Sequence, residues 1–212
     1  MRLVESLPRE TTLEAGGAAK GVAVAVVRQN KDDSGQGRVR VSYPWHSQPQ
    51  DSYWARVAMP MGGKDRGIYF IPEVGDEVLV AFERGDVRFP YVLGSLWNGV
   101  DYSPAKNGDG QNDVRMIKTR KGHKLTFDDS SKGLVRLELN DGKKLEINDD
   151  GIKLDDGNGN SLEIASQGGS MTLQAATSLS LKAPKIELQA TGSLDVKAGA
   201  TCTVSGALVR IN

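Results

Sequence analysis

The second half of the chain repeats a short pattern of apolar and polar positions. In SLSLKAPKIELQATGSLDVKAG (178–199), two aliphatic residues one position apart recur roughly every eight residues. Alternation with a period of two is typical of a β-strand that buries one face. Self-similarity at a fixed period indicates a stack of repeated units. We therefore expect thin strands with one apolar face each.

Strand-like segments of this kind extend through the whole second half. They lie at 124–127, 135–139, 144–147, 151–154, 161–164, 170–173, 178–181, 185–188, 193–196, 201–204 and 207–211. Between residues 140 and 160 the connections are rich in Asp-Gly and Gly-Asn, which favour tight reversals. After residue 171 the connections AATS, AP, ATG and AG lack these hairpin signals.

Such strands bury too little to be stable as single ribbons. Ordering eight residues costs about 8–16 kcal/mol, whereas two buried aliphatic side chains return about 1.5–3 kcal/mol each. Three chains around one axis supply the missing faces, so we predict an intertwined triple-stranded β-helix with threefold symmetry. A monomeric β-meander or sandwich is the alternative, and the Asp-Gly turns suit it. The predicted inward-facing trimer core consists of Leu179, Leu181, Ile186, Leu188, Leu194, Val196, Cys202 and Val204.

The first half has a different character, because all but one of the aromatic residues precede residue 103. Its β-branched and aromatic runs predict short strands, and their number and spacing favour an OB-type barrel. These runs lie at 21–29, 37–44, 53–60, 67–71, 76–83 and 91–97. The predicted fold class is all-β. The predicted domains are an N-terminal arm (1–19), the barrel (20–100), a Gly- and Asn-rich linker (101–113) and the β-helix (114–212).

Charge and cysteine content narrow the function. The 27 basic and 27 acidic residues balance, which argues against a phosphate-backbone binder, and a lone cysteine excludes an intrachain disulfide. No segment has the length of apolar residues that a membrane-spanning helix requires. The N-terminal residues lack the apolar region of a signal peptide.

Candidate chemical groups are few. Asp128 and Asp129 form a carboxylate pair in a turn-like segment, and His46 and His123 are the only histidines. Neither set predicts a catalytic, metal or cofactor site, so we expect no enzyme and no cofactor. Aromatic residues in the barrel leave open a second function, the stacking of single-stranded nucleic acid, although the neutral charge argues against nucleic acid as a partner. They are Tyr43, Trp45, Tyr53, Trp54, Tyr69 and Phe70.

Two stretches resemble a known family. The run 54–99, with PEVGDEVLVAFE followed by VLGSLWNG, resembles the OB domain of baseplate spike proteins. These include the baseplate assembly protein V family of contractile-tailed phages and the VgrG proteins of type VI secretion. The stretch VRMIKTRKGHKLTFDD (114–129) resembles the start of their β-helix.

The resemblance implies a homotrimeric spike at the tip of a contractile injection machine, which pierces the outer membrane of a target cell. VgrG proteins carry a large hub module before the OB domain, so a separate baseplate hub protein is expected at the barrel end. The alternative is a VgrG-type spike with its hub on another chain. A PAAR-like tip protein is expected on Leu208, Val209, Ile211 and Asn212. The expected location is a virion tail, baseplate or extracellular injection particle, assembled in the bacterial cytoplasm without a signal peptide.

Overall fold

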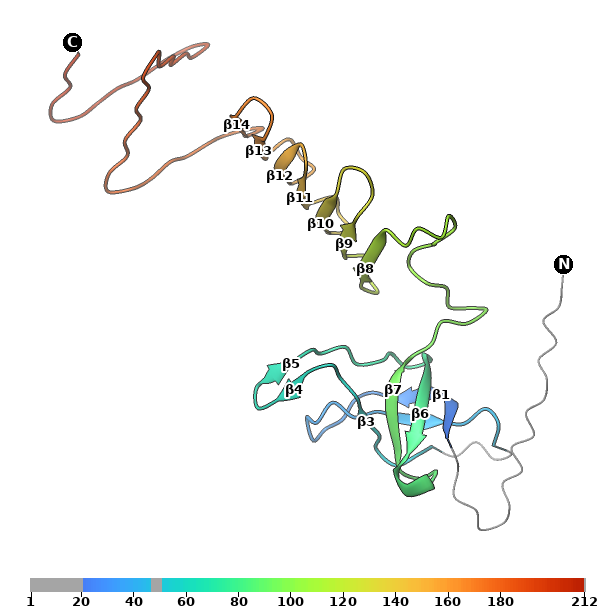
Figure 1. Ribbon diagram of the computed structural model, residues 1–212. Coiled ribbons are helices and arrows are strands. Elements are labelled where there is room, and N and C mark those ends of the chain that lie inside the picture. Colours follow the sequence, from blue (N-terminus) through green and yellow to red (C-terminus); the bar gives the residue numbers. More distant parts are fainter. Residues whose placement is uncertain (1–20, 47–50, 212) are drawn as a thin grey trace. The chain divides into compact units, whose positions relative to one another are not determined.

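A computed structural model describes residues 21–46 and 51–211 of the chain. The chain divides into two compact units, Met1–Lys106 and Asn107–Asn212 (Figure 1). Within the described residues the regular structure is β-strand, apart from one 3₁₀ turn, η1, at Glu83–Gly85. The fold is all-β, as predicted. The described part of the chain contains no helix with the length and apolarity that crossing a bilayer requires.

The first unit is a small closed barrel. Its sheet has the order β2-β1-β6-β7-β3, in which only β3 and β7 run parallel. Val39 and Ala55 join the two ends of this sheet, because their N–H groups donate to each other's carbonyl oxygens over 3.0 and 2.7 Å. Five strands closed in this way confirm the predicted OB-type barrel. The strands are β1 (Val22–Gln29), β2 (Arg40–Ser42), β3 (Arg56–Val57), β6 (Glu77–Phe82) and β7 (Pro90–Ser95).

The barrel interior is filled by small side chains from alternate strand positions. Ala25 and Val27 on β1 are fully buried, as are Val78 and Val80 on β6. In a five-stranded barrel there is space for little more than valine and alanine on the inward face, which explains the composition of these strands. The buried apolar residues are Ala25, Val27, Val39, Val41, Tyr43, Ala55, Val78, Val80 and Val92.

One predicted strand of the barrel is wrong. The run 67–71 was expected to be a strand, but the chain forms a minimal hairpin, β4 (Gly62–Gly63) with β5 (Arg66–Gly67), and residues 68–71 have no ladder partner. Tyr69 is 81% exposed. The five-stranded ring is already closed by Val39 and Ala55, so no edge remains for a sixth strand to join.

The second unit begins with a seven-stranded antiparallel sheet in which each strand pairs with the next along the chain (Figure 1). We had predicted pairing between chains for all the strand-like segments; for the six between residues 124 and 173 this is wrong, because they pair within the chain. The strands are β8 (Val114–Lys118), β9 (Lys124–Asp128), β10 (Leu134–Glu138), β11 (Lys144–Asn148), β12 (Gly151–Asp155), β13 (Ser161–Ala165) and β14 (Ser170–Gln174).

Tight turns allow this pairing. Between β11 and β12 the Asn148 side-chain oxygen accepts the N–H groups of Asp150 (2.9 Å) and Gly151 (3.1 Å). Gly151 has a φ of +150°, and a Cβ at this position would lie 1.9 Å from the carbonyl oxygen of Ile164 on β13. Only glycine fits there.

Residues 175–211 form no strand in the single chain, although segments at 178–181, 185–188, 193–196, 201–204 and 207–211 were predicted to be strands. The tail, as we call residues 175–211, follows an extended course past β14 (Figure 1). Its aliphatic side chains are exposed, Leu188 by 68% for example. The cross-strand hydrogen bonds that would define strands require a neighbour, and within the described residues this chain provides none.

Candidate functional site

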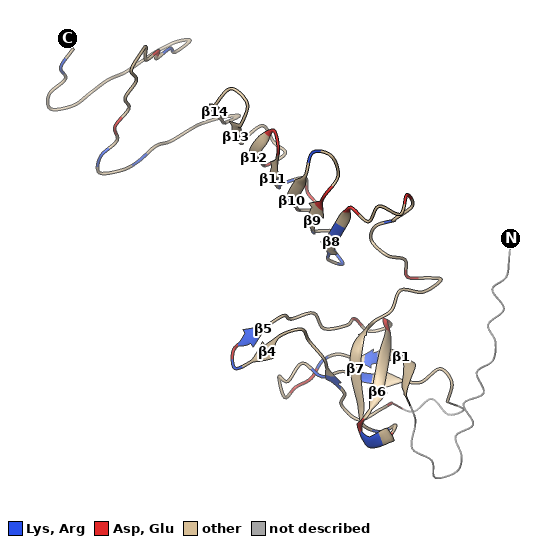
Figure 2. Ribbon diagram, viewed as in Figure 1, with Lys and Arg blue, Asp and Glu red and all other residues tan. Residues whose placement is uncertain are grey.

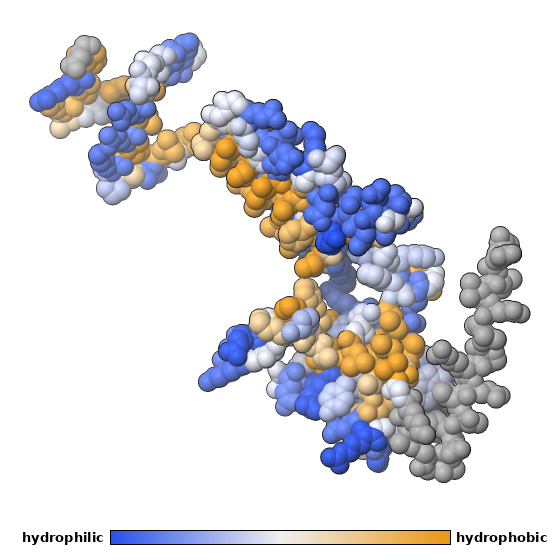
Figure 3. Space-filling model, in the orientation of Figure 1, coloured by the Kyte–Doolittle hydropathy of each residue, from blue (hydrophilic) through white to orange (hydrophobic). Residues whose placement is uncertain are grey.

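One face of the seven-stranded sheet is apolar from β9 to β14, with Arg115 beside Ile117 where it begins on β8, and we call it the apolar face. The strand register places its side chains in two columns, directly opposite one another from strand to strand. One column contains Phe127, Val135, Ile147, Ile152, Ile164 and Met171. The other contains Ile117, Leu125, Leu137, Leu145, Leu154, Leu162 and Leu173. Figure 3 shows the hydrophobic residues gathered along one side of β8–β14.

These side chains are too exposed for a surface that faces only water. Leu154 is 52% exposed, Leu137 47% and Met171 68%. Contiguous apolar patches of this kind mark contact surfaces. Full burial of an aliphatic side chain is worth about 1.5–3 kcal/mol, so covering both columns would supply a large driving force for association.

The opposite face of the same sheet is charged, and its charges are complementary. Arg136, Glu146, Lys153 and Glu163 lie in register across β10–β13, so that positive and negative side chains alternate. The Arg136 guanidinium is 3.0 Å from the Glu146 carboxylate. Figure 2 shows that charged residues follow β8–β13 and become sparse in the tail. The sheet therefore has one face suited to water and one suited to burial.

The predicted trimer-core residues of the tail are not gathered into a core by the single chain. Leu179, Leu181, Ile186, Leu188, Leu194, Val196, Cys202 and Val204 are all exposed. Of the predicted tip contacts, Leu208, Val209 and Ile211 are exposed as well, while Asn212 lies outside the described residues. Within one chain, nothing brings these two sets together.

The residues of the apolar face are not among the site residues predicted from the sequence. The signal was present, because KLEI (144–147), GIKL (151–154) and SLEI (161–164) carry the same alternation as the tail. What could not be seen was that consecutive strands align their aliphatic positions into unbroken columns. That alignment depends on the number of residues in each turn.

The polar candidates near the start of the sheet have local partners. Hydrogen bonding with the Ser130 side chain, followed by the Ser130 N–H at 2.9 Å, lowers the pKa of Asp128, and Asp129 pairs with Arg115 at 2.6 Å. His123 accepts the Asn140 N–H through Nδ1 over 3.3 Å. These contacts stabilise turns, and the pKa of Asp128 is shifted away from the raised value that a general acid requires.

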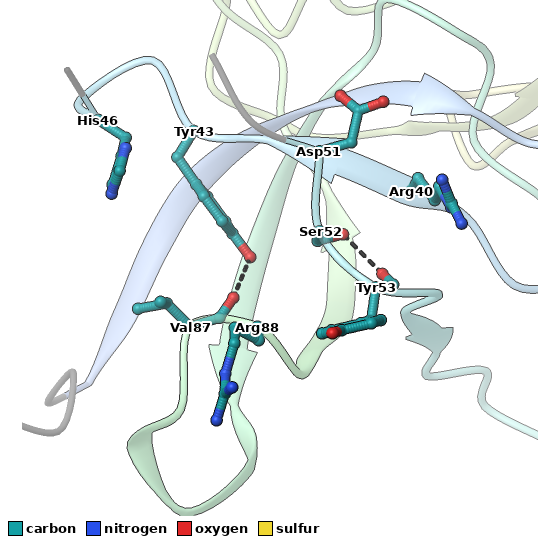
Figure 4. Close-up of a pocket in the computed structure, with 8 residues that line it drawn as sticks. All are labelled: Arg40, Tyr43, His46, Asp51, Ser52, Tyr53, Val87 and Arg88. Atoms are coloured by element: carbon teal, nitrogen blue, oxygen red, sulfur yellow. Dashed lines mark hydrogen bonds between the residues drawn. The ribbon is translucent and has the colours of Figure 1, made fainter. Parts of the chain in front are cut away.

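A pocket of about 300 Å³ opens beside β2 in the barrel. Figure 4 shows Tyr43 running across it, with its hydroxyl donating to the Val87 carbonyl over 2.7 Å. Burial raises the pKa of the Tyr43 hydroxyl. Arg88 forms a two-point ion pair with Asp86, at 3.0 and 2.7 Å, that lowers the pKa of Asp86 to about 2. The remaining lining residues are Arg40, His46, Asp51, Ser52 and Tyr53.

This pocket fits a structural role better than a chemical one. Ser52 is buried and its hydroxyl donates to the Tyr53 carbonyl over 2.7 Å while accepting the Val41 N–H over 3.1 Å, which ties β2 to the segment before β3. The described residues contain no group of three or more His, Cys, Asp or Glu side chains that could hold a metal ion.

The aromatic residues considered for nucleic-acid stacking are divided among four places. Tyr43 packs on Trp45, with ring centroids 5.1 Å apart, and the Arg40 guanidinium lies 5.1 Å from the centre of the Trp54 ring. Tyr53 stacks on Phe89 at the rim. Tyr69 and Phe70 lie exposed in the segment after β5. Stacking platforms need successive rings along one groove, and this distribution does not favour one.

Comparison with known proteins matches both units. Residues 23–97 match the family described as the type VI secretion system/phage-baseplate injector OB domain. Residues 114–168 match the phage baseplate V C-terminal trimerisation domain. The second match covers most of the seven-stranded sheet and supports a homotrimer.

Several curated proteins are similar to part of the chain. The type VI secretion system spike protein VgrG3 of Vibrio cholerae is 33% identical over 103 residues, which is 45% of this chain and 10% of that protein. VgrG5 of Pseudomonas aeruginosa is 38% identical over 111 residues, or 43% and 14%. The actin cross-linking toxin VgrG1 of Vibrio cholerae is 33% identical over 72 residues, or 32% and 7%.

The matched region is thus a small part of each of these relatives. The two family matches together cover more than half of this chain, in the order barrel and then trimerisation domain. With these two domains in this order, the chain belongs to the phage-baseplate V and VgrG family of spike proteins.

Proposed function

We propose that three copies of the chain associate through their apolar faces into a rigid, non-enzymatic spike that breaches a target cell envelope mechanically. The apolar face is the observation that carries this proposal, because both of its columns are apolar over β9–β14 and open to solvent in the single chain. The match to a trimerisation domain over the same strands supports three as the number of copies.

Threefold packing suits the shape of the sheet. Each sheet has one apolar and one charged face, so three sheets around an axis bury all the apolar faces and leave all the charged faces outside. Such a closed arrangement is symmetric and cannot grow further. With strands about 4.8 Å apart, seven strands give a prism of about 30 Å along the axis, to which the tail adds length.

The tail continues the spike in this proposal. Leu179, Leu181, Ile186, Leu188 and the later aliphatic residues of the predicted core face the common axis, where symmetry mates cover the side chains that the single chain leaves exposed. Cys202 behaves there as a small apolar residue. The far end, Leu208 to Asn212, offers an apolar contact for a PAAR-like tip protein.

The barrel unit contacts the baseplate hub in the same proposal. Tyr69 and Phe70, 81% and 57% exposed, are available for such a contact. The assembled particle is a phage tail, a related injection particle or a type VI secretion spike; the relatives whose names say spike protein belong to the last kind. The target outer membrane is met by the trimer and not by single chains.

Light scattering tests the proposal directly. The intact chain should have a mass of about 68 kDa, three times its 22.8 kDa. Leu154→Glu places three carboxylates on the axis, where burial without partners is costly, and should give a 23 kDa species or an insoluble product. Lys153→Gln, one residue earlier on the charged face, is the matched control and should remain trimeric. A monomeric wild-type chain would refute the proposal.

A further inference from the structure

The first two strands of the sheet, β8 and β9, have opposite charges at their two ends. Around the turn that joins them all the charged side chains are basic, and we call Lys118, Arg120, Lys121 and Lys124 the basic end. Where β8 begins and β9 ends, three carboxylates gather, and we call Asp113, Asp128 and Asp129 the acidic end. The β8–β9 register pairs Lys118 with Lys124 and Val114 with Asp128, so each set lies on one edge of the sheet (Figure 2).

Part of this charge has no opposite charge within its own chain. Lys124 and Asp129 have ion-pair partners in the chain, at 3.4 and 2.6 Å. Among the described residues, no ion pair joins Lys118, Lys121 or Asp113 to another side chain, and both lysines are exposed. The two strands thus keep unpaired positive charge on one edge of the sheet and an unpaired carboxylate on the other.

Packing of the apolar faces brings these two ends together in different copies. The strands of each sheet run across the axis of the proposed trimer, so the turns lie at its three corners. A threefold rotation moves no residue along the axis. At each corner, therefore, one edge of a sheet meets the opposite edge of the next sheet at the level of the same strands. The basic end of one copy then faces the acidic end of its neighbour.

The apolar columns do not fix this alignment by themselves. From β9 to β14 both columns have an apolar side chain on each strand, and the strands are about 4.8 Å apart. One sheet could therefore slide along the axis by whole strands and still place apolar side chains against apolar side chains. Such a slide separates the charges of β8 and β9 and leaves them unpaired. A single charged layer thus selects one alignment, as polar residues do in other repetitive interfaces.

We propose that the basic end of each copy contacts the acidic end of the next, in a closed ring of three charge contacts that aligns the copies along the axis. The inference rests on the proposed trimer and adds what sets the alignment of its copies and which copies can associate. Because these contacts lie at the exposed corners, salt weakens them more than it weakens the apolar packing.

Charge exchange in the full chain tests the ring. Lys118→Asp with Lys121→Asp makes both ends acidic, and Asp113→Lys with Asp128→Lys makes both ends basic. Each pair of changes should lower the thermal unfolding midpoint of the trimer by about 2–4 °C at low salt. The loss should shrink as the salt is raised from about 0.1 M to about 1 M, because the screening length falls from about 10 Å to about 3 Å.

The variant with all four changes restores opposite charges at each corner. It should melt above the variant in which both ends are basic, although the two share Asp128→Lys and lose the same hydrogen bond from the Ser130 N–H. Effects confined to one chain would instead add up, and the variant with four changes would melt lowest.

Co-expression of two differently tagged chains gives the sharper measurement. In a trimer that mixes wild-type copies with copies carrying all four changes, two of the three corners join like charges. Mixed trimers should therefore be about tenfold rarer than random association gives. Lys153→Gln, on the charged face and away from both ends, is the matched control and should mix with the wild type at random.

Random mixing of the wild type with the four-change variant, in a protein that is trimeric by light scattering, would refute the ring and leave the trimer standing. A wild-type mass of a single chain would refute both the trimer and the ring.

Discussion

Residues 114–174 and the tail carry the same alternation of aliphatic residues, but only the first of them is a sheet in the single chain. In both, two aliphatic side chains per segment point to one side. The difference lies in the connections: positive-φ glycines in Asp- and Asn-rich turns before residue 170, and Ala, Pro, Ser and Thr after it. Alternation thus specifies the face of a strand, whereas the connections specify which chain supplies its neighbour.

The comparison also separates two kinds of stability. A strand of the sheet has its hydrogen-bond partners within its own chain and needs the other copies only to cover its apolar face. A tail segment needs the other copies both for its hydrogen-bond partners and to cover its apolar side chains. Two aliphatic side chains cannot offset the cost of ordering about eight residues, so the tail should fold only on a trimer that already exists.

Deletion of residues 114–174 or of the tail should have the largest effect of the changes considered, because only one of the two deletions should abolish the trimer. A chain ending at Gln174 retains the apolar face and should remain trimeric by light scattering. A chain lacking 114–174, with the barrel joined to the tail, should be monomeric, because the tail has no sheet to extend. The opposite result, a trimer held by the tail alone, would show that the tail and not the sheet drives assembly.

Glycine substitutions should distinguish the sheet from the tail by a smaller effect, which is a shift of the thermal unfolding midpoint. In Gly151→Ala the new Cβ lies 1.9 Å from the Ile164 carbonyl oxygen, so β12 or β13 must shift. Backbone strain of this kind costs about 1–3 kcal/mol per chain, and the thermal unfolding midpoint of the trimer should fall. Gly192→Ala in the tail meets no atom within 4 Å in the single chain, and its midpoint should stay close to the wild type.

Equal decreases of the unfolding midpoint in Gly151→Ala and Gly192→Ala would contradict the proposed difference between the sheet and the tail. They would mean that Gly192 is as closely packed in the trimer as Gly151 is in the sheet.

Lowering the pH should have the smallest effect on the melting temperature, and it should act through the turns of the sheet. The Asn160 side chain, followed by the Asn158 and Asn160 N–H groups, lowers the pKa of Asp156. A carboxyl group whose pKa is lower in the folded state stabilises it above its unfolded pKa of about 3.9, and this contribution is lost as the pH falls through the folded value. The wild type should therefore melt above Asp156→Asn at pH 6, and the gap should narrow toward pH 3. A gap independent of pH would show that the Asp156 charge does not support the turn.

Much of the barrel could be predicted from sequence. The strands β1, β6 and β7 coincide with runs of β-branched and aromatic residues bounded by Gly, Pro and Asp, and these runs indicated their positions. The run 67–71 has the same composition but forms no strand. The bridge between Val39 and Ala55, a contact between distant residues, closes the ring without this run.

In the second unit, the strand positions between residues 124 and 173 could also be predicted, whereas their partners could not. The period of two is the same whether a neighbour belongs to the same chain or to another. Asp-Gly turns indicated pairing within the chain, whereas the energy balance of a single segment favoured pairing between chains.

Local chemistry along the chain was enough to predict the all-β class, most strands of the barrel and the strands between residues 124 and 173, because alternation and turn residues act over a few residues. Closure of the barrel, alignment of the aliphatic residues into two columns, the open edge of β14 and the pocket beside β2 were decided by the tertiary structure. Each of these depends on the register between segments, and register is a property of pairs of strands that no single strand carries.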